Sequence, residues 1–170
     1  STFIVKIASK IGKKELSIIG CFISAASFIL LFIIHTHNVW VWVGLIIVAT
    51  IGTSMFNMFI WAMITDVIDE SEVQTGVRQD GTIYSVYSFA RKLGQACSSG
   101  LSGILLSIIG YSSVTAFDPK VVDGIYNITC LVPAGGMILL LLALWFLYPL
   151  NKKRVEENAE KLRIKRNENA

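Results

Sequence analysis

The chain has 170 residues, of which 54% are hydrophobic and 16% are charged, and its formal net charge is +3. Ordinary soluble domains have a smaller apolar share and about 25% charged residues, so this balance excludes that class. The small positive charge predicts no nucleic-acid partner, because basic residues beside membrane spans account for it. Four long stretches are nearly free of charge: residues 16–34, 39–64, 84–109 and 125–150.

Each of these stretches is long enough to cross a hydrocarbon core of about 30 Å, which takes roughly 20 helical residues. A soluble helical bundle would show apolar stripes beside charged faces, and three of the stretches do not. We therefore expect an all-α polytopic membrane protein with four transmembrane helices. They would form a partial bundle within residues 1–150, followed by a charged cytoplasmic tail at 151–170.

The basic residues predict how the chain is oriented. They cluster before the first predicted span and after the last, whereas the two connections on the other side contain only Lys120. By the positive-inside rule, both chain ends and the middle connection are cytoplasmic in a multi-pass protein of the plasma membrane. The clusters are Lys6, Lys10, Lys13 and Lys14, then Lys152, Lys153, Arg154, Lys161, Arg163, Lys165 and Arg166.

Residues that usually perform chemistry are sparse. The three cysteines lie within predicted spans at spacings that indicate neither a disulfide framework nor a metal site. His35 and His37 have no nearby carboxylate or cysteine that would complete a zinc site. The spans contain no nucleophile–base pair either, so we expect no enzyme, no resident metal and no cofactor.

The second span carries a polar strip. Its members recur at spacings of three and four, which places them on one helical face. They are Thr50, Thr53, Ser54 and Asn57, continued by Trp61. Threonine and serine commonly make hydrogen bonds between membrane helices. Asn57 is less ordinary, since a buried carboxamide needs several partners.

The connection at 65–81 is acidic, with five carboxylates and one arginine, Arg78. The first interpretation is a hydrated loop. The second is a gate in which Asp66 and Asp69, at a helix end, pair with Arg78 or with lysines before the first span. Such pairs would hold the cytoplasmic side shut in one conformation. The lysines concerned are Lys10, Lys13 and Lys14.

The third stretch combines an apolar background with two stripes. The polar stripe contains Tyr84, Ser88, Arg91, Gln95, Ser98 and Ser102. The small-residue stripe contains Ser85, Ala96, Gly100, Gly103 and Ser107. This pattern predicts a helix that turns its polar face to a water-filled cavity and packs its small face on another helix. Alternatively, the span begins at Leu93, and Arg91 and Lys92 are cations at the membrane edge.

The sequence from residue 65 to 96 reads TDVIDESEVQTGVRQDGTIYSVYSFARKLGQA, and the span after it ends in IIGY. It resembles the glycoside–pentoside–hexuronide:cation symporters, which are sugar carriers of the major facilitator fold with twelve spans. The resemblance implies that this chain corresponds to the last four spans of such a carrier. It would be the C-terminal fragment of a cation-coupled sugar symporter, for a glycoside, glucuronide or pentoside, that works by alternating access.

The resemblance also implies roles for individual residues. The substrate-binding positions would be Asn57, Tyr87, Ser88 and Lys92. The cavity and coupling positions would be Lys92, Arg91 and Gln95. The cytoplasmic gate would be Asp66, Asp69 and Arg78. Three of the four pocket positions differ in residue type from a well-known family member, which favours a shared mechanism over a shared substrate.

Two questions stay open at this point. Periodicity places Arg91 nearer the centre of the polar stripe, whereas the resemblance favours Lys92, which we prefer as the cavity cation. The expected partners are the lipid bilayer, a sugar or glycoside, and the missing N-terminal half of the carrier, where the coupling Na⁺ or H⁺ would mainly bind. The alternative function is a small four-span scaffold or assembly protein without a transport pocket, whose polar stripes are oligomer contacts.

Overall fold

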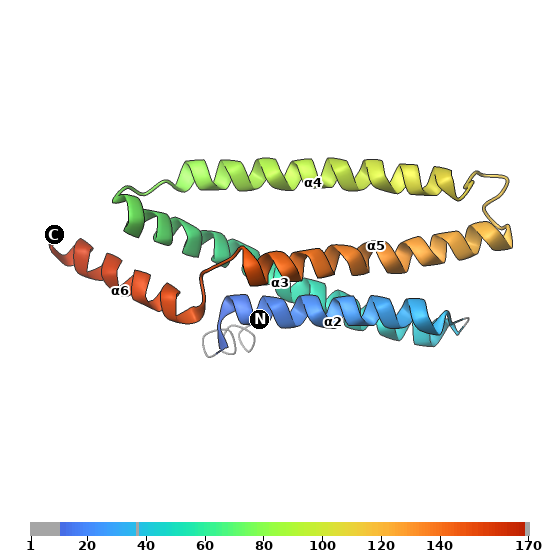
Figure 1. The fold of residues 1–170 in the computed structure, drawn as a ribbon, viewed down its shortest axis with the longest axis horizontal. Coiled ribbons are helices and arrows are strands. Elements are labelled where there is room, and N and C mark those ends of the chain that lie inside the picture. Colours follow the sequence, from blue (N-terminus) through green and yellow to red (C-terminus); the bar gives the residue numbers. More distant parts are fainter. Residues whose placement is uncertain (1–10, 37, 169–170) are drawn as a thin grey trace.

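The structure is a computed structural model that describes residues 11–36 and 38–168. Lys6, Lys10 and His37 lie outside the described residues. The described part forms five helices; α2, α4 and α5 run roughly along the long axis of the molecule, and α3 runs at an angle to it (Figure 1). They are α2 (Lys13–Ile34), α3 (Val39–Thr75), α4 (Asp80–Ile108), α5 (Pro119–Phe146) and α6 (Lys152–Glu168).

Local sequence signals explain where the helices begin and end. The Asn38 side chain accepts a hydrogen bond from the Trp40 backbone N–H and caps the start of α3. Gly76 ends α3 with φ 77°, a left-handed conformation that glycine adopts without steric cost. Pro119 occupies the first turn of α5, where its missing N–H has no helical partner to lose.

The packed part of the molecule consists of α2, α3 and α5, with α2 in extensive contact with both of the others. The helices α2 and α3 approach most closely where Gly20 faces Gly52. A Cβ atom at Gly20 would lie 2.6 Å from the backbone oxygen of Gly52, so only glycine permits this approach. Beside it, the hydroxyls of Ser24 and Thr53 lie 3.0 Å apart and share a hydrogen bond.

The helix α4 is arranged differently. None of its residues is buried, and a Cβ atom at Gly94, Gly100 or Gly103 would meet nothing within 4 Å. The prediction that its small-residue stripe packs on a neighbouring helix is therefore wrong for the described part of this chain. The reason is that α2 packs against both α3 and α5, while α4 lies apart from them over most of its length (Figure 1).

The boundaries of two elements also differ from those expected. Residues 65–75 are not a loop but the continuation of α3, and the nonhelical connection covers only 76–79. No glycine or proline interrupts the chain between Gly52 and Gly76, so the helix continues through the acidic segment. The helix α5 begins and ends earlier along the chain than the last predicted span, 125–150. It ends at Phe146, three residues before Pro149.

Three of the described helices are long and apolar enough to cross a membrane: α2, α3 and α5. The helix α4 does not belong to this group. Its 29 residues are sufficient in length, but Arg91, Lys92, Gln95 and its many serines and glycines lower its mean hydropathy. The all-helical membrane class is confirmed, whereas the count of four spans stays a prediction.

Candidate functional site

The contact that joins α4 to α3 is aromatic. The ring of Trp61 on α3 lies 5.4 Å from that of Tyr87 at an interplanar angle of 70°, and 6.2 Å from that of Tyr84. Edge-to-face pairs at such distances are favourable for aromatic rings. Tyr84 and Tyr87 are partly buried, while the rest of the predicted polar stripe is exposed. The contact therefore shows which face of α4 is turned toward α3.

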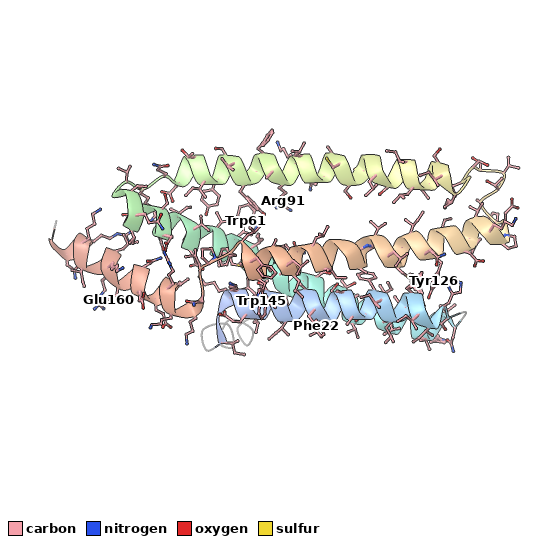
Figure 2. All side chains as sticks on the ribbon, viewed as in Figure 1. Phe22, Trp61, Arg91, Tyr126, Trp145 and Glu160 are labelled. Carbon is pink, nitrogen blue, oxygen red and sulfur yellow. The ribbon has the colours of Figure 1, made fainter. Side chains whose placement is uncertain are left out.

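Arg91 lies on this same face. At about 100° per residue it is only about 20° from Tyr84, and it lies about 6 Å beyond Tyr87 along the helix axis. Figure 2 places its side chain on the side of α4 that faces α3 and α5. Its guanidinium is exposed and has no carboxylate within ion-pair distance among the described residues.

A polar face of α3 continues from Trp61 in the same direction. Asn57, Ser54 and Thr50 are all exposed and lie within about 40° of Trp61 around the helix. The Asn57 amide donates one hydrogen bond, of 3.2 Å, to the backbone oxygen of Thr53, which leaves its other donor and its oxygen available. Counted from the Trp61–Tyr87 contact, Asn57 and Arg91 each lie one helical turn further along their own helix.

The predicted strip on α3 is therefore divided between two functions. The Thr53 hydroxyl is turned to Ser24 on α2 and stabilises helix packing. The other members, Thr50, Ser54 and Asn57, face away from α2. Part of the strip fits the ordinary interpretation of interhelical hydrogen bonding, and the remainder forms an exposed polar face whose Thr50 and Asn57 bond only to backbone oxygens of their own helix.

The remaining predicted positions on α4 are Ser88, Lys92 and Gln95, and all three are exposed. Gln95 continues the face of Arg91 because it lies one helical turn further on. Lys92 lies about 100° around the helix from Arg91, to one side of the face that meets α3. The helical count thus places Arg91, rather than Lys92, on the face of α4 that carries the aromatic contact with α3.

The predicted gate residues occupy the charged end of the molecule, by which we mean the start of α2, residues 66–80 and α6. Asp66 is 6% exposed, and both of its oxygens accept hydrogen bonds from Lys13 Nζ, at 2.6 and 2.8 Å. This pair connects α3 to the first turn of α2. Asp66 therefore bonds to one of the lysines before the first span and not to Arg78.

Arg78 forms a separate cluster. Its guanidinium donates to Asp69, Glu72 and Asp80, each at 2.9 Å. These bonds, to Glu72 first and then to Asp69 and Asp80, raise the pKa of Arg78 above its usual value, so it stays charged. The cluster holds the end of α3 to the beginning of α4 across a connection of four residues.

The sequence interpretation did not include the contacts of α6. Arg154 donates from Nε to Glu70 at 3.1 Å, and this hydrogen bond raises the pKa of Arg154. Arg166, three turns further along, lies 3.5 Å from Glu72. The sequence did contain a signal for these contacts: the tail is rich in basic residues, and the segment at 66–72 is rich in acidic ones. Sequence alone does not reveal which of these residues meet.

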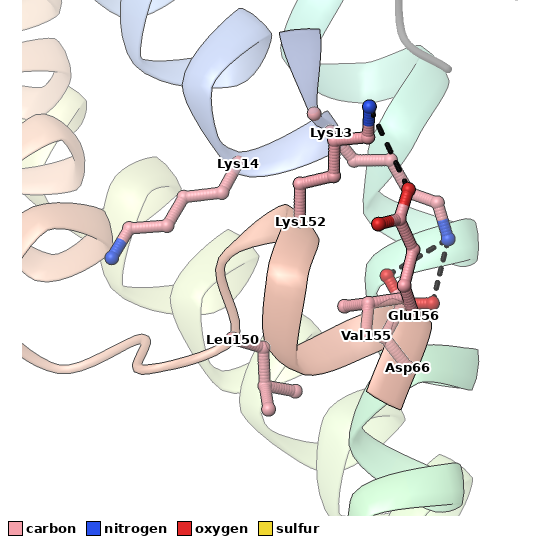
Figure 3. Close-up of a pocket in the computed structure, with 8 residues that line it drawn as sticks. Lys13, Lys14, Asp66, Leu150, Lys152, Val155 and Glu156 are labelled. Atoms are coloured by element: carbon pink, nitrogen blue, oxygen red, sulfur yellow. Dashed lines mark hydrogen bonds and ion pairs between the residues drawn. The ribbon is translucent and has the colours of Figure 1, made fainter. Parts of the chain in front are cut away.

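A cavity of about 210 Å³ lies beside the Lys13–Asp66 pair, between the starts of α2 and α6 (Figure 3). Its lining includes Lys14, Lys152 and Glu156. Lys14 donates to the Tyr148 backbone oxygen at 2.6 Å. No group of three metal-ligating side chains occurs in the part of the chain that the structure describes.

Comparisons with known proteins identify the kind of molecule that carries this arrangement. The profile of the family described as "MFS/sugar transport protein" matches residues 1–152. The "Glucuronide carrier protein homolog" of Escherichia coli K12 is 34% identical over 149 residues, which are 88% of this chain and 32% of the relative. The "Uncharacterized symporter YjmB" of Bacillus subtilis 168 is 37% identical over 89% of this chain and 33% of its own length.

A third relative is the "Putative sulfoquinovose importer" of Salmonella typhimurium LT2, 33% identical over 89% of this chain and 33% of its own length. No solved structure matches the chain. The chain spans about a third of the length of these curated relatives. The resemblance to sugar:cation symporters is confirmed, and the relatives are carriers rather than enzymes. This chain belongs to the MFS/sugar transport protein family.

Proposed function

We propose that the chain is the C-terminal third of a cation-coupled sugar symporter that works by alternating access. The observation that carries this proposal is the pair of exposed polar faces on α3 and α4, each of which adjoins the Trp61–Tyr87 contact. Polar groups exposed on helices of an apolar chain are tolerated where they line a water-filled path for solute. Family membership favours this function over the alternative of a four-span scaffold.

The substrate in this proposal is a sugar or glycoside. Its hydroxyls would bind to Asn57, Tyr87 and Ser88, and the remaining surface of the site would come from the other part of the carrier. Two of the relatives are named for an acidic sugar, a glucuronide and sulfoquinovose. Lys92, beside the polar face, would connect occupancy by sugar with occupancy by Na⁺ or H⁺ through its charge.

The charged end would serve as the cytoplasmic gate in the same cycle, which puts both ends of the chain on the cytoplasmic side of the plasma membrane. Asp66 is bonded to α2, and Asp69 is bonded to Arg78 beside α4. Rocking of the two halves of a carrier about a central site would require such contacts to change partners. Neutralising Asp66 and Asp69 together should therefore alter the rate of cycling more than the affinity for sugar.

The proposal is tested on the full-length carrier in proteoliposomes. We expect uptake of a labelled neutral glycoside to depend on an inward Na⁺ or H⁺ gradient and to stop when an ionophore collapses it. Lys92→Ala should reduce this coupled uptake more than Arg91→Ala. Absence of gradient-dependent uptake with any sugar would contradict the function. The reverse ranking of the two variants would transfer the coupling role to Arg91.

A further inference from the structure

The helix α6 is docked on the last two turns of α3 by contacts near both of its ends. Near its beginning, the Arg154 Nε donates to both oxygens of Glu70, at 3.1 and 3.2 Å, and Asn158 donates to the same carboxylate. These hydrogen bonds, the one from Arg154 first, lower the pKa of Glu70 to about 2. In its last turn, Lys165 donates to the Gly76 backbone oxygen at 3.1 Å. Asn158 is only 4% exposed, so α6 is packed against its surroundings at this point.

One carboxylate belongs both to this docking and to the cluster around Arg78. The Glu72 Oε2 accepts a hydrogen bond from Arg78 at 2.9 Å, and the guanidinium of Arg166 on α6 lies 3.5 Å from the same oxygen. The Glu72 side chain is only 13% exposed. A charged group with so little access to water depends on its cations for stabilisation. Displacement of α6 would therefore change the surroundings of the bond between Glu72 and Arg78.

The charges of the cluster also favour the docking of α6. Arg78 donates to the carboxylates of Asp69, Glu72 and Asp80, so one positive charge faces three negative ones. Carboxylates gathered at one guanidinium repel each other, and a second cation reduces this repulsion. Arg166 supplies such a cation from α6. Docking of α6 thus stabilises the arrangement in which Arg78 connects the end of α3 to the beginning of α4.

We propose that α6 is a strap on the cytoplasmic gate, by which we mean a segment that holds the connection between α3 and α4 in place, and that Glu72 is the positioning residue through which it acts. This inference rests on the proposed function, which assigns the gate to this end of the molecule. Opening of the gate would require Arg78 to exchange its carboxylate partners. The helix α6 opposes this exchange as long as Arg154 and Arg166 keep it on α3.

Hydrogen exchange of the full-length carrier tests the strap. It is followed in the peptide 73–84, which contains the connection and the Gly76 N–H, bonded to the Glu72 backbone oxygen at 2.9 Å. The double variant Arg154→Gln/Arg166→Gln removes both docking arginines. Exchange in this peptide should become about fivefold faster, as expected for the loss of two ion pairs whose arginines are exposed.

The matched control is Arg163→Gln, because Arg163 is an exposed arginine of α6 whose partner Glu160 is on the same helix. It should exchange at the wild-type rate, and a double variant that exchanges no faster than this control would overturn the inference. Glu72→Gln should also accelerate exchange, and adding Arg166→Gln to it should have little further effect, because both changes remove the same pair. Full additivity of the two would overturn the role of Glu72.

A second readout connects the strap to the gate. Arg166→Gln should change the rate of gradient-driven sugar uptake into proteoliposomes by about twofold or more, while the affinity for sugar stays at the wild-type value. An unchanged uptake rate, or a change in affinity alone, would confine α6 to a structural role and overturn the inference. Absence of gradient-driven uptake by the wild-type carrier would instead contradict the proposed function, and hydrogen exchange would still decide whether α6 holds the connection.

Discussion

The helices α2 and α4 both contact α3, but only α2 packs closely against it within the described residues. On α2, Gly20 meets the backbone of α3, and Lys13 meets Asp66. On α4, the glycines meet nothing within 4 Å, and Arg91 has no carboxylate partner among the described residues. The difference teaches that α2 is held by contacts within its own chain, whereas the described residues cover little of α4.

The largest expected effect would come from removing a partner on the α2 side. Lys13→Ala leaves the buried Asp66 without a counter-charge, which should cost about 3 kcal/mol, the low end for a buried pair broken on one side because Lys13 is one-third exposed. Thermal unfolding of the full-length carrier in detergent measures this loss. The double variant with Asp66→Asn should recover part of it. A loss as large in Lys153→Ala, whose side chain is 86% exposed, would show that the pair itself has no special role.

A similar but smaller effect is expected from the helix crossing. Gly52→Ala would place a methyl group against the Gly20 backbone, and overpacking of this kind should cost about 2 kcal/mol. Gly44→Ala, on the same helix with open space around it, should be neutral or slightly stabilising in the same unfolding assay. The comparison is sharpened by Gly103→Ala on α4. A loss there equal to that of Gly52→Ala would show that another segment packs against α4 in the whole carrier.

The contact between α3 and α4 should contribute less. Trp61→Ala removes two aromatic pairs, each worth about 0.5 kcal/mol because Trp61 is 49% exposed, and should let α4 move away from α3. Paired spin labels on the two helices would measure a longer and broader distance distribution. Trp40→Ala provides the control, because Trp40 is 84% exposed near the start of α3. An unchanged distance in Trp61→Ala would mean that other contacts hold α4 in place.

The smallest effect is expected at α6. Glu70→Gln weakens an exposed interaction with Arg154, which should cost less than about 1 kcal/mol of stability. It should nevertheless release α6, because Glu70 also accepts a hydrogen bond from Asn158. Limited proteolysis within α6 should become faster, and Glu160→Gln, whose partner Arg163 is on α6 itself, should not change the rate. Equal rates in wild type and Glu70→Gln would contradict this account of the docking.

The sequence predicted the parts of this fold that depend on composition and local spacing. Uninterrupted apolar stretches identified α2 and α5, and the recurrence of polar residues identified the face of Asn57. Long-range partners could not be derived in the same way. Nothing in the sequence indicated that Gly20 faces Gly52, or that Glu70 selects Arg154, because such pairs depend on how whole helices cross.

The candidate site shows the same division. Periodicity places Arg91 on the same face of α4 as Tyr84, and the structure shows that Tyr84 contacts Trp61. The preference for Lys92 as the cavity cation came from the resemblance, and it stays a prediction. No described helix packs against the small-residue stripe, because a pattern of small residues indicates that a helix is approached closely but does not identify what approaches it.

The continuity of α3 has a mechanical consequence. Its 37 residues form a helix of about 55 Å without a proline. The close contact between Gly52 and Gly20 of α2 lies partway along this helix, so α3 can tilt about that point. A tilt of only about 5° at Gly52 would displace Glu72, about 30 Å away, by about 2.6 Å, comparable with the length of an ion pair. A tilt of α3 at the glycine crossing would therefore strain the salt bridges that Glu72 makes with Arg78 and Arg166.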